Sequence, residues 1–91
     1  MAVTVKLPTQ LRDAAGGATN AQVEGGTVGE ALSNLYAQYG ELRERIADSD
    51  GALRRFVNVY IGGEDIRFLD GLDTPVSDGD ELTILPAVAG G

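Results

Sequence analysis

The residues most open to chemistry lie at the carboxyl end of the chain. Residues 88–91 read Val-Ala-Gly-Gly and carry little bulk and no side-chain charge. Extended, four to five residues reach roughly 15 Å at about 3.3–3.6 Å each, enough to enter a narrow channel in another protein. Neither Gly90 nor Gly91 has a Cβ, so a nucleotide or a nucleophile can approach the terminal carboxylate closely.

The carboxylate of Gly91 is a poor acyl donor as it stands, because oxide is a very poor leaving group. Conversion to an acyl-adenylate would supply a good leaving group, and sulfur could then displace AMP to leave a thiocarboxylate. The chain needs no side-chain catalyst for this, which agrees with its lack of Cys and His. We therefore expect adenylation and sulfur attachment at Gly91, with Gly90 and Ala89 giving access. The alternative is that the Gly-Gly end is an incidental frayed terminus.

The composition narrows the classes of function. With 91 residues the chain is one domain with a single small core, which disfavours a self-sufficient enzyme. The absence of Cys and His excludes thiol catalysis, imidazole acid–base chemistry and ordinary zinc sites within the chain. We expect no catalytic residue, no metal and no bound cofactor in this chain.

The net charge of −7 bears on the partners. An acidic surface repels phosphate backbones and anionic membranes, so neither nucleic acid nor membrane is an expected partner. It favours partners with basic docking surfaces, although the same charge could simply keep a small protein monomeric. The amino terminus lacks a long apolar stretch after a basic start, and no segment approaches the roughly 20 apolar residues of a membrane span. The expected location is cytoplasmic.

The first half of the chain predicts two strands and a helix. Alternating apolar residues predict strands at 3–7 and 19–24. Thr27 and Glu30 have capping-box spacing, an apolar stripe at helical spacing follows, and Gly40 is placed to end the helix. A glycine-rich loop before a helix could also cradle a phosphate. Glu30 already occupies this helix start, which favours the cap.

The second half predicts a short helix at 41–47 and strands at 54–61, 64–68 and 81–87. A hairpin, a helix and returning strands form an α+β two-layer domain. We expect the β-grasp (ubiquitin-like) arrangement: a mixed sheet of about five strands, with one main helix packed on one face and the first and last strands at the centre. Residues 1–87 would form this domain, and residues 88–91 a flexible carboxyl-terminal tail.

Strand alternation predicts an uncovered apolar patch on the other face of the sheet. The side chains expected to face the helix are Val57, Val59, Ile61, Leu82, Ile84 and Pro86. Phe56, Tyr60 and Leu85 would then face away, and Ala87 and Val88 would continue from them toward the tail. Such patches commonly mark partner sites, so these five residues are the predicted docking residues. The alternatives are that a loop or the short helix covers the patch, or that the register is off by one.

Several segments resemble the ThiS/MoaD family of ubiquitin-like sulfur carriers over essentially the whole chain. Residues 77–91, SDGDELTILPAVAGG, look like the family's DGDE…PPVAGG ending, and residues 27–32, TVGEAL, are similar to its helix start. Residues 55–60, RFVNVY, and the LPAVAGG ending most resemble the CysO-type cysteine-synthesis carriers. Ala87 stands where MoaD proteins usually carry a second proline.

The resemblance implies a cycle of partner enzymes. A ThiF/MoeB-like adenylyltransferase would activate Gly91, using ATP and magnesium that it binds itself, and a sulfurtransferase or sulfide source would form the thiocarboxylate. A sulfur-acceptor synthase would then take the sulfur, for instance a pyridoxal-phosphate-dependent cysteine synthase followed by a metalloprotease, or a thio-metabolite synthase. The alternatives are a ubiquitin-like modifier conjugated to lysines, a MoaD-type subunit for molybdopterin synthesis, and a plain β-grasp binding module.

Overall fold

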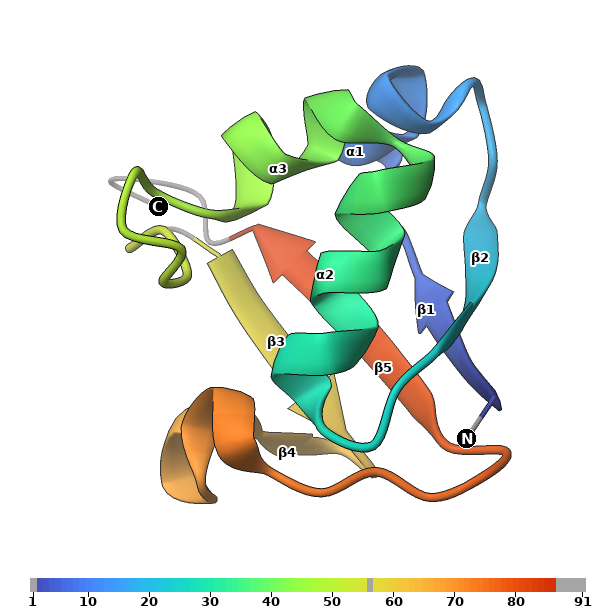
Figure 1. The fold of residues 1–91 in the computed structure, drawn as a ribbon. Helices are drawn as coiled ribbons and strands as arrows, with labels where there is room; N and C mark the ends of the chain where they lie inside the picture. Colours follow the sequence, from blue (N-terminus) through green and yellow to red (C-terminus); the bar gives the residue numbers. More distant parts are fainter. Residues whose placement is uncertain (1, 56, 87–91) are drawn as a thin grey trace.

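A five-stranded mixed sheet forms one layer of the molecule (Figure 1). The computed structural model describes residues 2–55 and 57–86, and residues 1, 56 and 87–91 lie outside the described part. The strands are β1 (Ala2–Lys6), β2 (Asn20–Glu24), β3 (Val57–Ile61), β4 (Glu64–Asp65) and β5 (Glu81–Pro86). Their order is β2-β1-β5-β3-β4, with β1 and β5 parallel at the centre and the other pairs antiparallel. This confirms the expected central pairing of the first and last strands.

The second layer is helical and covers one face of the sheet (Figure 1). It consists mainly of α2 (Val28–Gln38) and α3 (Gly40–Ile46). Four short elements of the described residues lie in the connections: α1 (Thr9–Arg12), followed by the 3₁₀ turn η1 (Asp13–Ala15), and the 3₁₀ turns η2 (Ile66–Phe68) and η3 (Gly71–Asp73). The molecule is an α+β two-layer domain, as the element order predicts.

The core lies between the layers and follows the predicted register. Val59, Leu82 and Ile84 are fully buried, and Val57 is nearly so. Val3 and Val5 of β1 meet Leu32 and Leu35 of α2 in the same cluster; all four are buried. At roughly 25 cal/mol per Å² of apolar surface, this burial is the main stabilising contribution to a domain of this size.

The start of α2 is a capping box, as the sequence predicts. The Thr27 hydroxyl oxygen accepts a hydrogen bond from the Glu30 backbone N–H at 3.2 Å. Glu30 reaches back and accepts from the Gly26 backbone N–H at 2.7 Å. The Glu30 carboxylate thus already accepts a backbone N–H at the start of this helix. That N–H is not free to bind a phosphate, which disfavours the alternative of a phosphate-binding loop.

The first helix stops directly before Gly40, as the sequence predicts: α2 ends at Gln38, and Tyr39 is its C-cap. Tyr39 makes the break with φ −131° and ψ 85°. Gly40 is also the first residue of α3, and the Tyr39 carbonyl accepts the N–H of Leu42 in the first turn of that helix at 3.0 Å. The change of direction brings Leu42 and Ile46 into the core, where both are fully buried.

Two segments differ from the sequence-based prediction. The expected strand 64–68 pairs only over Glu64–Asp65, because the Asp65 carboxylate accepts the Arg67 N–H at 2.8 Å and turns the chain into η2. The strand expected from residue 54 begins at Val57. Between β1 and β2, residues 9–15 form α1 and η1 and bury Leu11.

Candidate functional site

The described part of the chain ends at Pro86, in the middle of the sheet. Pro86 is in register with Val57, and β5 is paired with β1 on one side and β3 on the other. Gly91, predicted to carry the chemistry, lies outside the described residues, as do Gly90 and Ala89, predicted to give access to it, and Val88 and Ala87, predicted to dock. Their roles therefore stay predictions. The structure shows that β5, the strand that precedes these residues, lies at the centre of the sheet.

Two of the predicted docking residues lie on the outer face of the sheet. Leu85 is 46% exposed, and Tyr60 is half-buried. Tyr60 is in register with Thr83, two residues before Leu85, so the two side chains are diagonal neighbours on one face. The two main helices of the described residues, α2 and α3, lie on the opposite face of the sheet (Figure 1). The third predicted member of the patch, Phe56, lies outside the described residues.

A guanidinium that sequence reasoning missed lies beside this patch. Arg67 donates from Nη1 to the Asn58 side-chain oxygen at 2.7 Å and from Nη2 to the Val57 carbonyl at 2.8 Å. Asn58 is in register with Leu85, so Arg67 flanks the exposed leucine on the β3 side. Nine residues separate Arg67 from Asn58, and only the η2 turn brings them together. No sequence pattern signals such a contact.

The opposite side of the patch is also cationic. Lys6 is in register with Thr83 and lies 3.4 Å from the Glu81 carboxylate, with both side chains exposed. Exposed pairs of this kind add little to stability. The outer face therefore presents Tyr60 and Leu85 between two basic side chains, with the polar rim that is usual around a docking surface.

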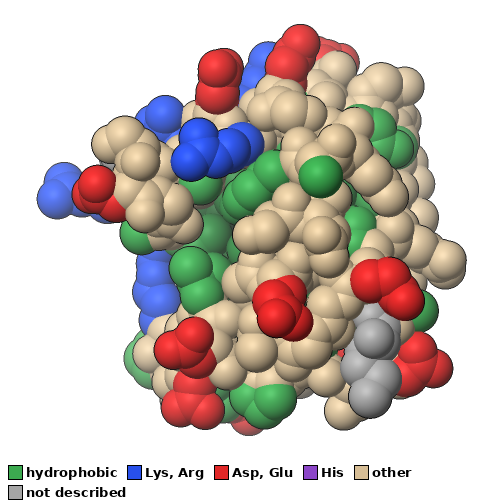
Figure 2. Space-filling view, in the orientation of Figure 1, with side chains coloured by type: hydrophobic (Ala, Val, Ile, Leu, Met, Phe, Trp, Pro, Cys, Tyr) green, Lys and Arg blue, Asp and Glu red, His purple; other side chains and the backbone are tan. Residues whose placement is uncertain are grey.

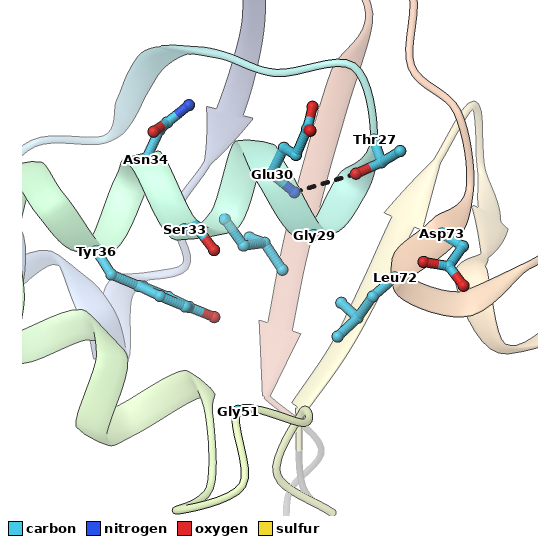
Figure 3. Close-up of a pocket in the computed structure, with 10 residues that line it drawn as sticks. Thr27, Gly29, Glu30, Ser33, Asn34, Tyr36, Gly51, Leu72 and Asp73 are labelled. Atoms are coloured by element: carbon cyan, nitrogen blue, oxygen red, sulfur yellow. Dashed lines mark hydrogen bonds between the residues drawn. The ribbon is translucent and has the colours of Figure 1, made fainter.

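A groove lies on the helical face of the molecule (Figure 3). Gly29, Ser33 and Tyr36 of α2 line one side of it, and Leu72 and Asp73 of η3 line the other. Burial raises the pKa of the Tyr36 phenol to about 12, and the nearby Arg43 guanidinium acts in the opposite direction. The phenol is neutral at physiological pH, so it supplies no base or nucleophile.

Charge is unevenly spread over the surface. In Figure 2, most Lys and Arg side chains lie at the upper left, with carboxylates beside and above them, whereas nearly all charged side chains in the lower half are carboxylates. In residues 2–55 and 57–86 the structure contains no group of three or more His, Cys, Asp or Glu side chains arranged to hold a metal ion. Within the same ranges, no helix combines the length and apolar character that crossing a bilayer requires.

A mixed sheet with β1 and β5 parallel at its centre, and with helices packed on one face, is the β-grasp arrangement of ubiquitin-like proteins. The ThiS family model matches residues 5–91, and the chain belongs to the ThiS family. Sulfur carrier protein CysO from Mycobacterium tuberculosis is 50% identical over 93 residues, with 100% of both chains covered. The chain is a CysO-like sulfur carrier and not an enzyme.

Solved structures show the same relationship. CysO in the Amycolatopsis orientalis BexX/CysO complex is matched with a TM-score of 0.89 and 45% identity, over 98% of this chain and 99% of that chain. SAMP1 from Haloferax volcanii is matched with a TM-score of 0.86 and 32% identity over 100% of both chains. The β-grasp fold predicted from the sequence is confirmed.

Proposed function

We propose that this sulfur carrier works through the carboxylate of Gly91, which is adenylated, converted to a thiocarboxylate and then used as a sulfur donor. The observation that carries the proposal is the family match, which extends to residue 91 and thus includes the terminal Gly-Gly. The chemistry is consistent with a chain that has no Cys and no His of its own. Gly90 and Ala89 give the partner enzymes access to the carboxylate.

The proposed partners follow from the steps of this cycle. A ThiF/MoeB-like adenylyltransferase supplies the activation with its own ATP and magnesium, and a sulfurtransferase or sulfide source supplies the sulfur. The acceptor is a cysteine synthase or a thio-metabolite synthase. The CysO in complex with BexX, 45% identical to this chain, supports a carrier that docks on a second protein. Where the acceptor is a cysteine synthase, a metalloprotease would trim the product.

Intact-mass spectrometry tests the proposal directly. The chain is incubated with the purified adenylyltransferase, ATP, magnesium and a sulfide source. The expected result is the mass change for one oxygen replaced by one sulfur. A chain lacking Gly91 should show no change, whereas Gly40→Ala, at an exposed site where a Cβ meets no atom within 4 Å, should load like the wild type. Unchanged mass of the wild-type chain would contradict the proposal.

The docking patch has its own test. Leu85→Glu places a carboxylate in the exposed apolar part of the outer face, so binding to the adenylyltransferase should weaken by about tenfold or more. The fold should survive because Leu85 is half exposed. Isothermal titration measures the affinity and circular dichroism checks the fold. Wild-type affinity in a folded Leu85→Glu chain would show that this face is not the docking surface. Phe56→Glu is expected to act in the same way.

A second function, conjugation to lysines as a protein modifier, is favoured by one observation. SAMP1 from Haloferax volcanii, a small archaeal modifier protein, is similar over the full length at 32% identity. Both functions require an activated Gly91, so the terminus does not distinguish them. Lysine-linked adducts in cells without any thiocarboxylate would favour the modifier. A MoaD-type role in molybdopterin synthesis is a third alternative, disfavoured by Ala87 in place of the usual proline.

A further inference from the structure

The most exposed large apolar side chain in the described part of the molecule is not on the predicted patch. Phe68 is 85% exposed, and its neighbour Leu69 is 41% exposed. A strand at 64–68 would have put Phe68 on the same face as Ile66, which is 1% exposed. The η2 turn instead rotates successive residues by about 120°, so Ile66 enters the core and Phe68 points to solvent. We name the Phe68–Leu69 pair the knuckle.

The knuckle is held in place by its backbone on both sides. The Asp65 carboxylate accepts the Arg67 N–H at 2.8 Å, and the Leu69 N–H donates to the Ile66 carbonyl at 2.9 Å. After the knuckle, the Asp70 N–H donates to the hydroxyl oxygen of buried Thr74 at 3.1 Å. These hydrogen bonds fix the backbone that carries Phe68, so less backbone conformational entropy is lost on binding, and an aromatic side chain on a fixed backbone suits an interface anchor.

Nearly all of the protein's net charge surrounds the knuckle in sequence. Residues 64–81 contain seven carboxylates and one arginine, a net charge of −6 out of the chain's −7. The single arginine, Arg67, is turned back onto β3, where it binds Asn58 and the Val57 carbonyl. Glu64, Asp70 and Asp73 are exposed. The knuckle therefore emerges from a surface of strongly negative potential.

We propose that the knuckle is a second docking site, for a protein surface that has an apolar socket bordered by Lys and Arg. The apolar side chains match the socket and the carboxylates match its rim. If a second copy of this chain docked here, two segments that each carry a net charge of −6 would face and repel each other. An anionic membrane would be repelled in the same way. The inference rests on the proposed function, because the partner is one of the enzymes that load or unload Gly91.

The knuckle is separate from the outer-face patch. It follows β4, which pairs with the Tyr60–Ile61 end of β3, whereas Pro86 pairs with Val57 at the other end. A partner can therefore hold the knuckle at one end of β3 while β5 brings the chain to Pro86 at the other end. Two contacts at opposite ends of the sheet would fix the orientation of the carrier on the enzyme.

The experiment compares Phe68→Ser with the exposed control Ala37→Ser. Each variant is titrated into the purified adenylyltransferase and, separately, into the purified acceptor synthase. For at least one enzyme, Phe68→Ser should weaken binding tenfold or more, while Ala37→Ser should have no effect. Asp70→Asn with Asp73→Asn should lower the association rate and flatten its dependence on salt. Thermal unfolding should be unchanged in Phe68→Ser, because the side chain is exposed.

The outcomes separate the two proposals. If the wild type is thiocarboxylated and Phe68→Ser binds both enzymes as tightly as the wild type, the knuckle proposal alone is overturned. If the wild type binds neither enzyme and is not thiocarboxylated, the proposed function and the knuckle fall together. A concentration-dependent dimer that Phe68→Ser abolishes, seen by sedimentation, would assign this surface to a second copy and overturn the proposal.

Discussion

Gly25 shows how one residue fixes the approach of two elements. It joins β2 to the loop before α2, and a Cβ built on it would lie 2.6 Å from the Ala31 backbone nitrogen. The obstructing atom is helix backbone, which cannot move aside as a flexible side chain could. The glycine is required here because the chain passes against the helix, and the sequence alone suggests only a turn.

Gly25→Ala should therefore destabilise the domain by about 1–3 kcal/mol, the usual cost of forcing extra atoms into a packed site. Gly40→Ala is the matched control, because a Cβ there meets no atom within 4 Å. That control should be neutral or slightly stabilising. Urea unfolding followed by circular dichroism measures both. Equal stability of the two variants would contradict the close approach.

Tyr36 makes a prediction about alkaline pH. Its folded pKa of about 12 lies above the ordinary value of about 10, because burial disfavours the phenolate. Between pH 10 and 12 the unfolded chain loses this proton and the folded chain keeps it. The contribution to stability is thus complete below pH about 10 and is lost as the pH rises toward 12.

Tyr36→Phe should remove this part of the alkaline destabilisation. We expect the free energy of unfolding of the wild type, relative to the variant, to fall as the pH is raised from about 9 to about 11.5. Urea titrations at several pH values measure it, and tyrosinate absorbance should show one late-titrating phenol. Parallel pH profiles for the two chains would show that the phenol titrates normally.

Among the elements, β2 illustrates how an exposed strand edge is protected. It is an edge strand of the sheet, paired only with β1. Two side-chain amides of α2, one turn apart, cover its carbonyls: Asn34 donates to Glu24 at 2.6 Å and Gln38 to Gln22 at 3.3 Å. Carbonyls occupied in this way are less available to another strand, which limits edge-to-edge pairing.

The double variant Asn34→Ala, Gln38→Ala should open this edge. We expect a loss of about 1–2 kcal/mol for the two hydrogen bonds, partly offset by the higher helix propensity of alanine. We also expect more self-association, measured by sedimentation at high protein concentration. Ser33→Ala, exposed on the same helix, is the control. A double variant that stays as monomeric as the control would show that the amides do not protect the edge.

Patterns local in sequence predicted most of these elements. Alternation placed Val57, Val59 and Leu82 correctly, and the spacing of Thr27 and Glu30 predicted the start of α2. The failures came where a contact outside the local pattern decided the conformation. The Asp65 carboxylate accepts the Arg67 N–H and ends the strand there. The apolar residues Ile66 and Phe68 had predicted that this strand would continue.

The candidate site was only partly accessible to sequence reasoning. The outer face bearing Tyr60 and Leu85 followed from period-two alternation. Arg67 beside it did not, because η2 and β3 meet only in three dimensions. The exposure of Phe68 was not predicted for the same reason. The expected strand at 64–68 would have placed Phe68 on the buried face beside Ile66. The period of apolar residues along the sequence predicts least about surface features that are formed by turns.

At the scale of the whole molecule, the proposed function places folding and chemistry in different parts of the chain. The core cluster in the described part of the chain runs from Val3 to Ile84, and β5 brings the chain to Pro86 at the sheet centre. The proposed chemistry lies only at Gly91. A domain that carries its reactive group at the end of its chain can leave the catalytic machinery to its partners.

Removing residues 88–91 should therefore separate the two roles. We expect the truncated chain to keep its free energy of unfolding within about 0.5 kcal/mol, as substitutions outside the core usually do, and to lose all thiocarboxylation. Val59→Ala, at a fully buried site, should do the reverse: it should cost about 1–3 kcal/mol yet still be loaded while folded. Urea unfolding and intact mass give both readouts. A truncated chain that unfolds much more easily would place residues 88–91 within the folding unit and move the domain boundary beyond residue 87.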